Sequence, residues 1–107
     1  MTDRRRTLLI LGGTGDALCL AREIEKKWSR ELWVIYSLAG ATRNPATAGG
    51  EVRIGGFGGD KGLARYLRDK NIDFLIDSTH PFSTQISRHA ALAAAATGTC
   101  LLYTSDA

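Results

Sequence analysis

The sequence predicts an α/β fold built on a Rossmann-like, doubly wound parallel sheet, in a single domain. Short apolar runs without polar alternation indicate strands that are covered on both faces. Segments of helical periodicity separate these runs, and this alternation is typical of parallel sheets with right-handed crossovers. Unusual loops, several of them rich in glycine, follow the apolar runs. We therefore expect these loops to meet at the carboxyl edge of the sheet, where such folds bind ligands.

The first half of the chain predicts two strands joined by a helix. Residues 7–11 (TLLIL) form a continuous apolar run, and a helical pattern begins at Asp16. Residues 31–37 (ELWVIYS) are expected to form the second strand, whereas residues 40–50 have no period and are expected to form a loop. The apolar stripe of the helix comprises Ala17, Ala21, Ile24 and Trp28.

The second half predicts three further strands and two helices. The short strand 51–54 (EVRI) precedes a helix that Asp60 is expected to cap, and the strand 73–78 (DFLIDS) ends before a His-Pro pair, since the residue before proline avoids helical angles. A third helix is expected from about 83 to 96, and residues 100–104 (CLLYT) are a candidate fifth strand. The helix faces expected to be buried comprise Leu63, Tyr66 and Leu67 in one, and Ile86, Ala90, Ala93 and Thr97 in the other.

Composition and charge exclude several classes of protein. The chain has 107 residues, 44% of them apolar and 23% charged, so it suits one small globular domain rather than a disordered or fibrous chain. The net charge is +3, partly from an arginine run at 4–6, and no interleaving of basic and aromatic residues indicates nucleic-acid binding. The run 7–11 is too short for an export signal or a membrane span, so a cytoplasmic location is expected.

The cysteines and one histidine are interpreted as structural residues. Cys19 and Cys100 are far apart and form no CxxC pair, so no metal site is indicated and a reducing compartment is expected. Cys19 lies within a helical pattern and is interpreted as a small core or boundary residue. His89 lies within the third expected helix and is interpreted as a surface or boundary residue.

The turn after the first strand, formed by Gly12, Gly13, Thr14 and Gly15, is a candidate phosphate site. Glycine permits a tight turn and brings backbone amides close to an anion, and the following helix points the positive end of its dipole at the same place. The match to G-x-G-x-x-G is imperfect, because Leu18 stands where the last glycine belongs. The alternative is a tight turn with no ligand. Asp16 would repel a phosphate there unless its side chain turns outward or the phosphate lies nearer the glycines.

Ser37 and Arg43, which follow the second apolar run, predict the choice of dinucleotide. A carboxylate at this place would accept hydrogen bonds from the ribose hydroxyls of NAD, whereas a hydroxyl and a guanidinium suit the 2′-phosphate of NADP. We therefore expect NADPH as the cofactor, with NADH as the alternative. Two other roles stay open for Arg43, which could stabilise an exposed loop or contact a carboxylate of the substrate.

Two further loops are expected at the same edge. Gly56 and Phe57 lie in a glycine cluster (GGFGGD) that suits a flexible lid, a close backbone contact or an ordinary turn. Thr79, His80, Pro81 and Phe82 follow the fourth strand. His80 could donate a proton near neutral pH, although a histidine before proline is more often a positioned hydrogen-bonding group. No residue is assigned as catalytic, and no cluster of metal ligands is recognised.

Four motifs in one order resemble the precorrin-6A reductase family of cobalamin biosynthesis: LILGGTGDA, SLAGATRNP, GEVRIGGFGG with GLARYLRDKNID, and DSTHPFSTQIS. The resemblance implies an NAD(P)H-dependent oxidoreductase acting on a CH–CH bond. It would reduce precorrin-6A, or the cobalt-containing counterpart of this tetrapyrrole, to the corresponding precorrin-6B, with the nicotinamide supplying the hydride. It also implies that residues 12–15 and 37–43 belong to the cofactor and substrate cleft and that residues 79–82 line its floor.

The resemblance further implies a longer protein with two α/β domains. We expect residues 1–98 to be the N-terminal NAD(P)-binding domain, incomplete and without the C-terminal domain, so that this fragment can be inactive. Residues 99–107 are expected to be a non-family tail, because their end resembles a translated sequencing adapter. The complete enzyme is expected to be a monomer. Two other classes stay open, namely another NADP-dependent Rossmann reductase and a non-catalytic module that senses NADP(H).

Overall fold

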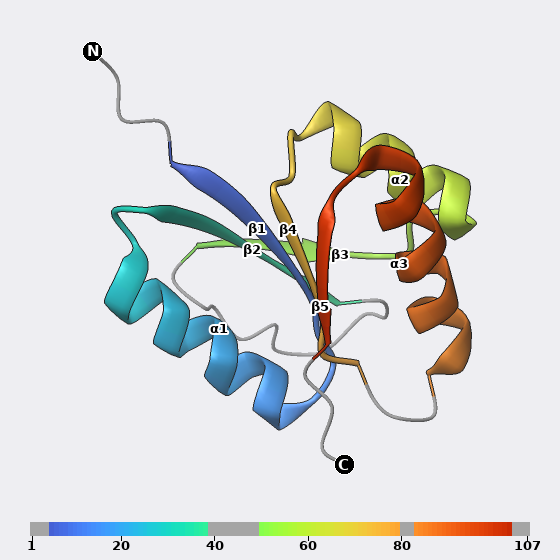
Figure 1. Ribbon diagram of the computed structural model, residues 1–107. Helices are drawn as coiled ribbons and strands as arrows, with labels where there is room; N and C mark the ends of the chain where they lie inside the picture. Colours follow the sequence, from blue (N-terminus) through green and yellow to red (C-terminus); the bar gives the residue numbers. More distant parts are fainter. Residues whose placement is uncertain (1–4, 39–49, 80–82, 104–107) are drawn as a thin grey trace.

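The computed structural model describes residues 5–38, 50–79 and 83–103. These residues form a five-stranded parallel sheet with helices on both faces (Figure 1). In chain order the elements are β1 (Arg6–Leu11), α1 (Gly15–Trp28), β2 (Leu32–Leu38), β3 (Glu51–Ile54), α2 (Gly59–Asp69), β4 (Phe74–Asp77), α3 (Thr84–Thr97) and β5 (Cys100–Tyr103).

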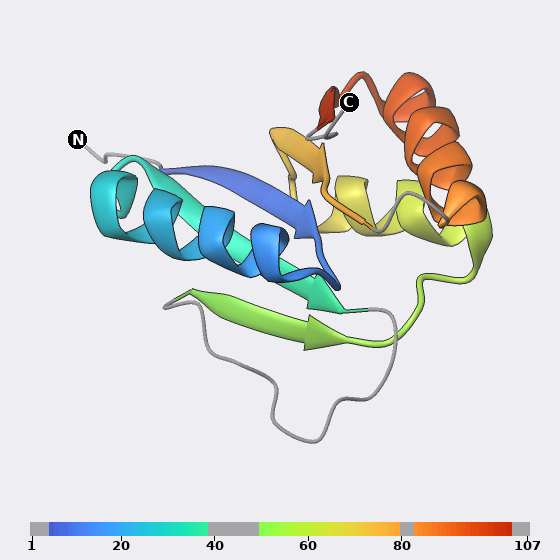
Figure 2. The ribbon, with the colours of Figure 1, turned by 90° about the horizontal axis from the view of Figure 1, so that it is seen from below.

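The strand order is β3-β2-β1-β4-β5, so the chain winds outward from β1 and then crosses back to the other side of β1. Figure 2 shows α1 on one face of the sheet, with α2 and α3 on the other. The predicted doubly wound, Rossmann-like fold is therefore confirmed, and so is β5 as a fifth strand. The winding direction reverses between β1 and β4, and ligand crevices in such sheets open at the carboxyl ends of the strands beside that reversal.

Two apolar cores lie on the two faces of the sheet, because successive residues of a strand point to opposite sides. On β1, Leu8 and Ile10 pack toward α1, whereas Leu9 and Leu11 pack toward α2 and α3. The alanines predicted for the face of α3 are part of the core on the side of α2 and α3, and their small side chains allow α3 to approach the sheet closely. The buried residues of α1 are Ala17, Ala21 and Ile24, and those of α3 are Ala90, Ala93 and Ala94.

The predicted boundaries of most elements lie within one residue of the observed ones, but three residue-level predictions are wrong. Asp60 is not the cap of α2: the N-cap is Gly58, whose φ of 86° is a left-handed conformation that glycine adopts without strain, and Asp60 lies in the first turn. Trp28, predicted in the buried stripe, is the last residue of α1 and is 47% exposed. Cys19 is exposed because it is two residues from buried Ala17, which places it on the opposite side of the helix.

Candidate functional site

The register of the sheet places one row of side chains side by side at the carboxyl ends of the strands. Leu11 of β1 pairs with Ser37 of β2 on one side and with Asp77 of β4 on the other, and Ser37 pairs in turn with Arg53 of β3. Paired residues of parallel strands point to the same face, so this row lies on the face covered by α2 and α3. Ser37 and Asp77 are buried polar residues within it.

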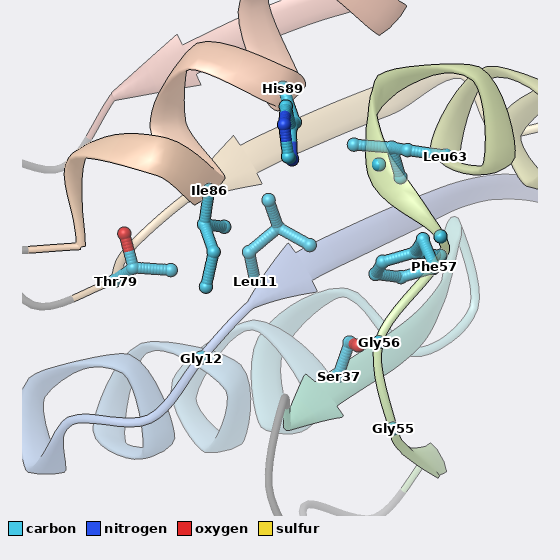
Figure 3. Close-up of a pocket in the computed structure, with 12 residues that line it drawn as sticks. Leu11, Gly12, Ser37, Gly55, Gly56, Phe57, Leu63, Thr79, Ile86 and His89 are labelled. Carbon is cyan, nitrogen blue, oxygen red and sulfur yellow. The ribbon is translucent and has the colours of Figure 1, made fainter.

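A cavity of about 180 Å³ lies against this row, and its lining includes the loop Gly55–Gly58, the start of α2 and the first two turns of α3. Figure 3 shows Phe57 and Ile86 on opposite sides of Leu11, with His89 reaching toward Leu11 from α3. Among the described lining residues, the polar side chains are the hydroxyls of Ser37 and Thr79 and the imidazole of His89. Walls of this kind suit an uncharged ring better than a phosphate.

The turn after β1 adjoins the cavity through Gly12, which is part of the lining. The N–H of Gly12 donates to the carbonyl oxygen of Ser37 at 2.8 Å, which continues the β1–β2 ladder past the end of β1. On the α1 side of the sheet, a Cβ added to Gly12 would collide with the ring of Tyr36. The phenol oxygen of Tyr36 also accepts a hydrogen bond of 3.4 Å from the N–H of Gly13. Gly12 is therefore required by close packing, in addition to any role toward a ligand.

Thr14 joins this turn to α1 and to the end of β4. Its hydroxyl is the N-cap of α1, accepting from the N–H of Ala17 at 3.0 Å, and it donates to the carbonyl oxygen of Ser78 at 3.3 Å. Positions for a Cβ at Gly13 and Gly15 have no atom of the described residues within 4 Å, so these residues leave the outer side of the turn open. Asp16 is exposed in the first turn of α1. The helix N-terminus is thus accessible to an anion.

Asp77 and Thr79 order the chain where β4 ends. One carboxylate oxygen of Asp77 accepts hydrogen bonds from the hydroxyl of Thr79 at 2.7 Å and from the N–H of Thr79 at 3.2 Å. The hydroxyl of Thr79 also lies 3.5 Å from that of Ser87 on α3. These bonds hold Thr79 at the edge of the cavity, and they tie the end of β4 to the helix that supplies Ile86 and His89.

Tyr66 of α2 is the described residue whose acid–base behaviour departs most from its ordinary value. Burial raises the pKa of Tyr66 above 10.0, the Glu51 carboxylate raises it further, and the Arg53 guanidinium lowers it. The phenol oxygen is buried and has no hydrogen-bond partner among the described residues.

The described residues, 5–38, 50–79 and 83–103, contain no group of three or more His, Cys, Asp or Glu side chains that could hold a metal ion. No helix within these ranges is long and apolar enough to cross a membrane.

The structure brings together part of the residue set predicted from the sequence. Gly12, Ser37, Gly56, Phe57 and Thr79 line one cavity. The rest of the glycine turn adjoins the cavity through Gly12 without lining it. Four predicted site residues lie outside the described residues, namely Arg43, His80, Pro81 and Phe82.

Sequence reasoning missed His89 and Ile86 as cavity residues. His89 is half-buried, so its interpretation as a boundary residue is compatible with the structure, but its place in the lining was not predicted. A signal was present: His89 follows Ile86 by three residues, and residues at this spacing share a helix face. The apolar residues and alanines of that face predict packing on the core along its whole length, and this pattern does not distinguish the first turns of α3 as part of a cavity.

The strand order, the reversal beside β1 and the glycine turn before α1 define a Rossmann-like α/β domain whose cavity lies at the carboxyl edge of its sheet. The chain belongs to the precorrin-6x reductase CbiJ/CobK family, whose model matches residues 7–105. The sequence motifs predict that the family segment ends at residue 98, whereas the family model matches to residue 105. The boundary of the domain at residue 98 stays a prediction.

Relatives and solved structures agree with this family. A precorrin-6A reductase of Rhodococcus erythropolis is 49% identical over 81% of this chain and 34% of its own length. That of Sinorhizobium sp is 46% identical over 89% of this chain and 36% of its own length. A solved structure of CobK precorrin-6A reductase has a TM-score of 0.86 at 39% identity, covering 95% of this chain and 39% of that one. The chain thus spans about a third of the length of these relatives.

Proposed function

We propose that this chain is the cofactor-binding part of an NADPH-dependent reductase that acts on precorrin-6A, or on its cobalt-containing counterpart, in cobalamin biosynthesis. Membership of the family supports a reductase, and relatives named precorrin-6A reductase support the tetrapyrrole substrate. A chain with a net charge of +3 suits a ligand rich in carboxylates. The complete enzyme is proposed to act as a cytoplasmic monomer.

The observation that carries this proposal is the position of Gly12 between two kinds of binding surface. On one side lies the turn Gly12–Gly15, which is open outward and leads into the N-terminus of α1. On the other side lies a largely apolar cavity that Gly12 itself lines. An anion at the turn and an uncharged ring in the cavity could belong to one ligand, and a dinucleotide has both parts.

The residues present therefore fit a nicotinamide dinucleotide. The amides at the start of α1 would receive phosphate, while Phe57 and Ile86 would enclose a ring and exclude water. The hydroxyls of Ser37 and Thr79 would orient polar groups at its rim. When bound, the reduced nicotinamide supplies the hydride for the reaction, whereas the protein contributes positioning and electrostatics.

The proposed preference for NADPH over NADH rests on the sequence at Arg43, which lies outside the described residues. A guanidinium can make two charge-assisted hydrogen bonds to the 2′-phosphate that only NADPH carries. The Arg43→Ala variant is therefore expected to lose more affinity for NADPH than for NADH, as measured by titration of each cofactor. Equal losses for the two cofactors would remove this basis for the preference.

Binding of NADPH to Gly15→Val tests the proposed site directly. The position for a Cβ at Gly15 is open, so the variant is expected to fold, but its side chain would occupy the space in front of the helix N-terminus. We expect NADPH affinity to fall by about tenfold or more, which corresponds to about 1.4 kcal/mol. Cys19→Val, an exposed position one turn further along α1, is the matched control and should bind like the parent chain. Unchanged affinity in Gly15→Val would reject the phosphate site.

A further inference from the structure

Arg53, the third residue of β3, makes hydrogen bonds to the loop that immediately follows its own strand. Its Nη1 donates to the carbonyl oxygen of Gly55 at 2.7 Å, and its Nη2 donates to that of Gly56 at 2.9 Å. One planar guanidinium thus spans two consecutive carbonyl groups, which a lysine ammonium could not do with the same fixed geometry. Each terminal nitrogen uses one of its two N–H groups in these bonds, so the carbonyl oxygens of the loop fix the orientation of the guanidinium.

The same guanidinium also lies against two aromatic rings. Its carbon atom is 3.7 Å from the ring centroid of Phe57 and 5.0 Å from that of Tyr66. The two rings contact each other edge to face, with centroids 5.1 Å apart. A cation over an aromatic face is attracted to it, more strongly where water is partly excluded. Arg53 therefore connects the loop to α2, which carries Tyr66.

Phe57 connects the cluster formed by Arg53, Phe57 and Tyr66 to the cavity. The residue lies in the loop, contacts Arg53, and lines the cavity opposite Ile86 (Figure 3). A Cβ on Gly62 of α2 would collide with the Phe57 carbonyl oxygen, so the backbone of the loop also packs closely on this helix. Three of the four glycines around Phe57 have positive φ, and glycine-rich backbone loses much conformational freedom when it is ordered. The loop therefore needs a partner that holds it in one conformation.

We infer that Arg53 is the positioning residue that holds Phe57 and the loop Gly55–Gly58 in the conformation that binds ligand. This inference rests on the proposed function for the identity of the ligand, but the geometry of the cluster does not depend on it. Without Arg53 the loop populates other conformations, and the apparent affinity for a ligand falls in proportion to the fraction of molecules that remain competent.

Hydrogen exchange in the full 107-residue chain tests the positioning role without any ligand. Arg53→Met and Arg53→Lys are compared with Arg22→Met, which removes a charge from an exposed site on α1, on the other face of the sheet. The Gly55 N–H donates to the Leu38 carbonyl oxygen at 2.8 Å, and exchange of this amide is expected to accelerate by about tenfold in both Arg53 variants, while exchange within β1 stays as in the parent chain. Unchanged loop exchange would overturn the inference, and so would an equal acceleration in β1, because that indicates general destabilisation.

A titration with NADPH then tests whether Arg53 acts through Phe57. In Arg53→Met the dissociation constant is expected to rise about tenfold if the competent fraction falls to about a tenth. Adding Phe57→Leu to this variant should cause little further loss, because residues that act as a unit are not additive. If the loss of affinity in the double variant equals the sum of the losses in Arg53→Met alone and in Phe57→Leu alone, the route through Phe57 is overturned. If the parent chain fails to bind NADPH, the proposed function fails, and the exchange measurement still decides the role of Arg53.

Discussion

Replacing Gly12 by alanine should destabilise the fold through a single steric contact. The φ angle of Gly12 is outside the left-handed region, so the backbone itself accepts alanine. The added Cβ would lie 2.5 Å from the Tyr36 ring carbon that bears the hydroxyl and 2.6 Å from the hydroxyl oxygen. Tyr36 cannot turn into solvent to relieve this contact, because it is 3% exposed and packs in the α1 core.

The expected cost is that of overpacking a core, about 1–3 kcal/mol in the free energy of unfolding. Urea unfolding followed by circular dichroism measures this cost, and an unchanged m-value would show that the two end states are comparable. Gly15→Ala is the matched control. Its Cβ meets no atom within 4 Å in the part of the chain that the structure describes, and alanine in a first helical turn should leave stability unchanged or raise it by about 0.4–1 kcal/mol.

A second substitution identifies the contact responsible. Tyr36→Leu is itself destabilising because it removes a buried ring, but it also makes room for the new methyl group. The double variant Gly12→Ala/Tyr36→Leu should therefore be more stable than the sum of the single losses predicts, by about 1 kcal/mol or more. The reasoning is refuted if Gly12→Ala is as stable as the parent chain, or if the two losses simply add.

Three further substitutions test the neighbouring contacts. Thr14→Ala removes the side-chain cap of α1 and should lower the free energy of unfolding, measured in urea, by about 1 kcal/mol. Thr14→Ser keeps a hydroxyl and should lose much less stability; equal losses in the two variants would contradict the capping role. Thr79→Val removes the hydroxyl donor to the Asp77 carboxylate and should cost about 1.5 kcal/mol, and a neutral effect would show that this bond is unimportant. The pKa of Tyr66 is raised in the folded protein, so the stability that this group contributes is present below pH 10.0 and is lost as the pH rises through the folded-state pKa. The free energy of unfolding, measured in urea, should therefore fall less with rising alkaline pH in Tyr66→Phe than in the parent chain. An identical pH profile in the variant would contradict this expectation.

The fold could be predicted from the sequence because each strand has a local signal. The apolar runs that became β1 and β4 lack alternation, as expected for strands covered on both faces, and the helices between them have clear stripes. The error at Asp60 has a physical cause, since the rule for caps assumes a side-chain acceptor, whereas this chain enters α2 through a left-handed Gly58. Gly58 and Asp60 are two residues apart, and each could begin the helix. Which of them does so depends on how α2 packs on the rest of the protein, and the local sequence does not determine that packing.

The candidate site was predictable in its loops but not in its contacts. The glycines of the turn were recognised from their position between strand and helix. That Gly12 packs on Tyr36, and that the loop at Phe57 is held by Arg53, depends on pairs of residues that the sheet register or a folded loop brings together. His89 was missed for the same reason, because a helix face can serve the core along one part of its length and a cavity along another.

The register between β1 and β2 is what joins the two halves of the site. Ile10 pairs with Tyr36, and Leu11 pairs with Ser37. Tyr36 and Ser37 are neighbours in a strand and so point to opposite faces: Tyr36 supports the glycine turn from the α1 side, while Ser37 lines the cavity on the side of α2 and α3. A slip of one residue would exchange these faces and place a hydroxyl under the turn and a phenol in the cavity. The hydrogen bond from the Gly12 N–H to the Ser37 carbonyl oxygen lies one step beyond the last paired residues of β1, so it both fixes this register and attaches the turn to the cavity.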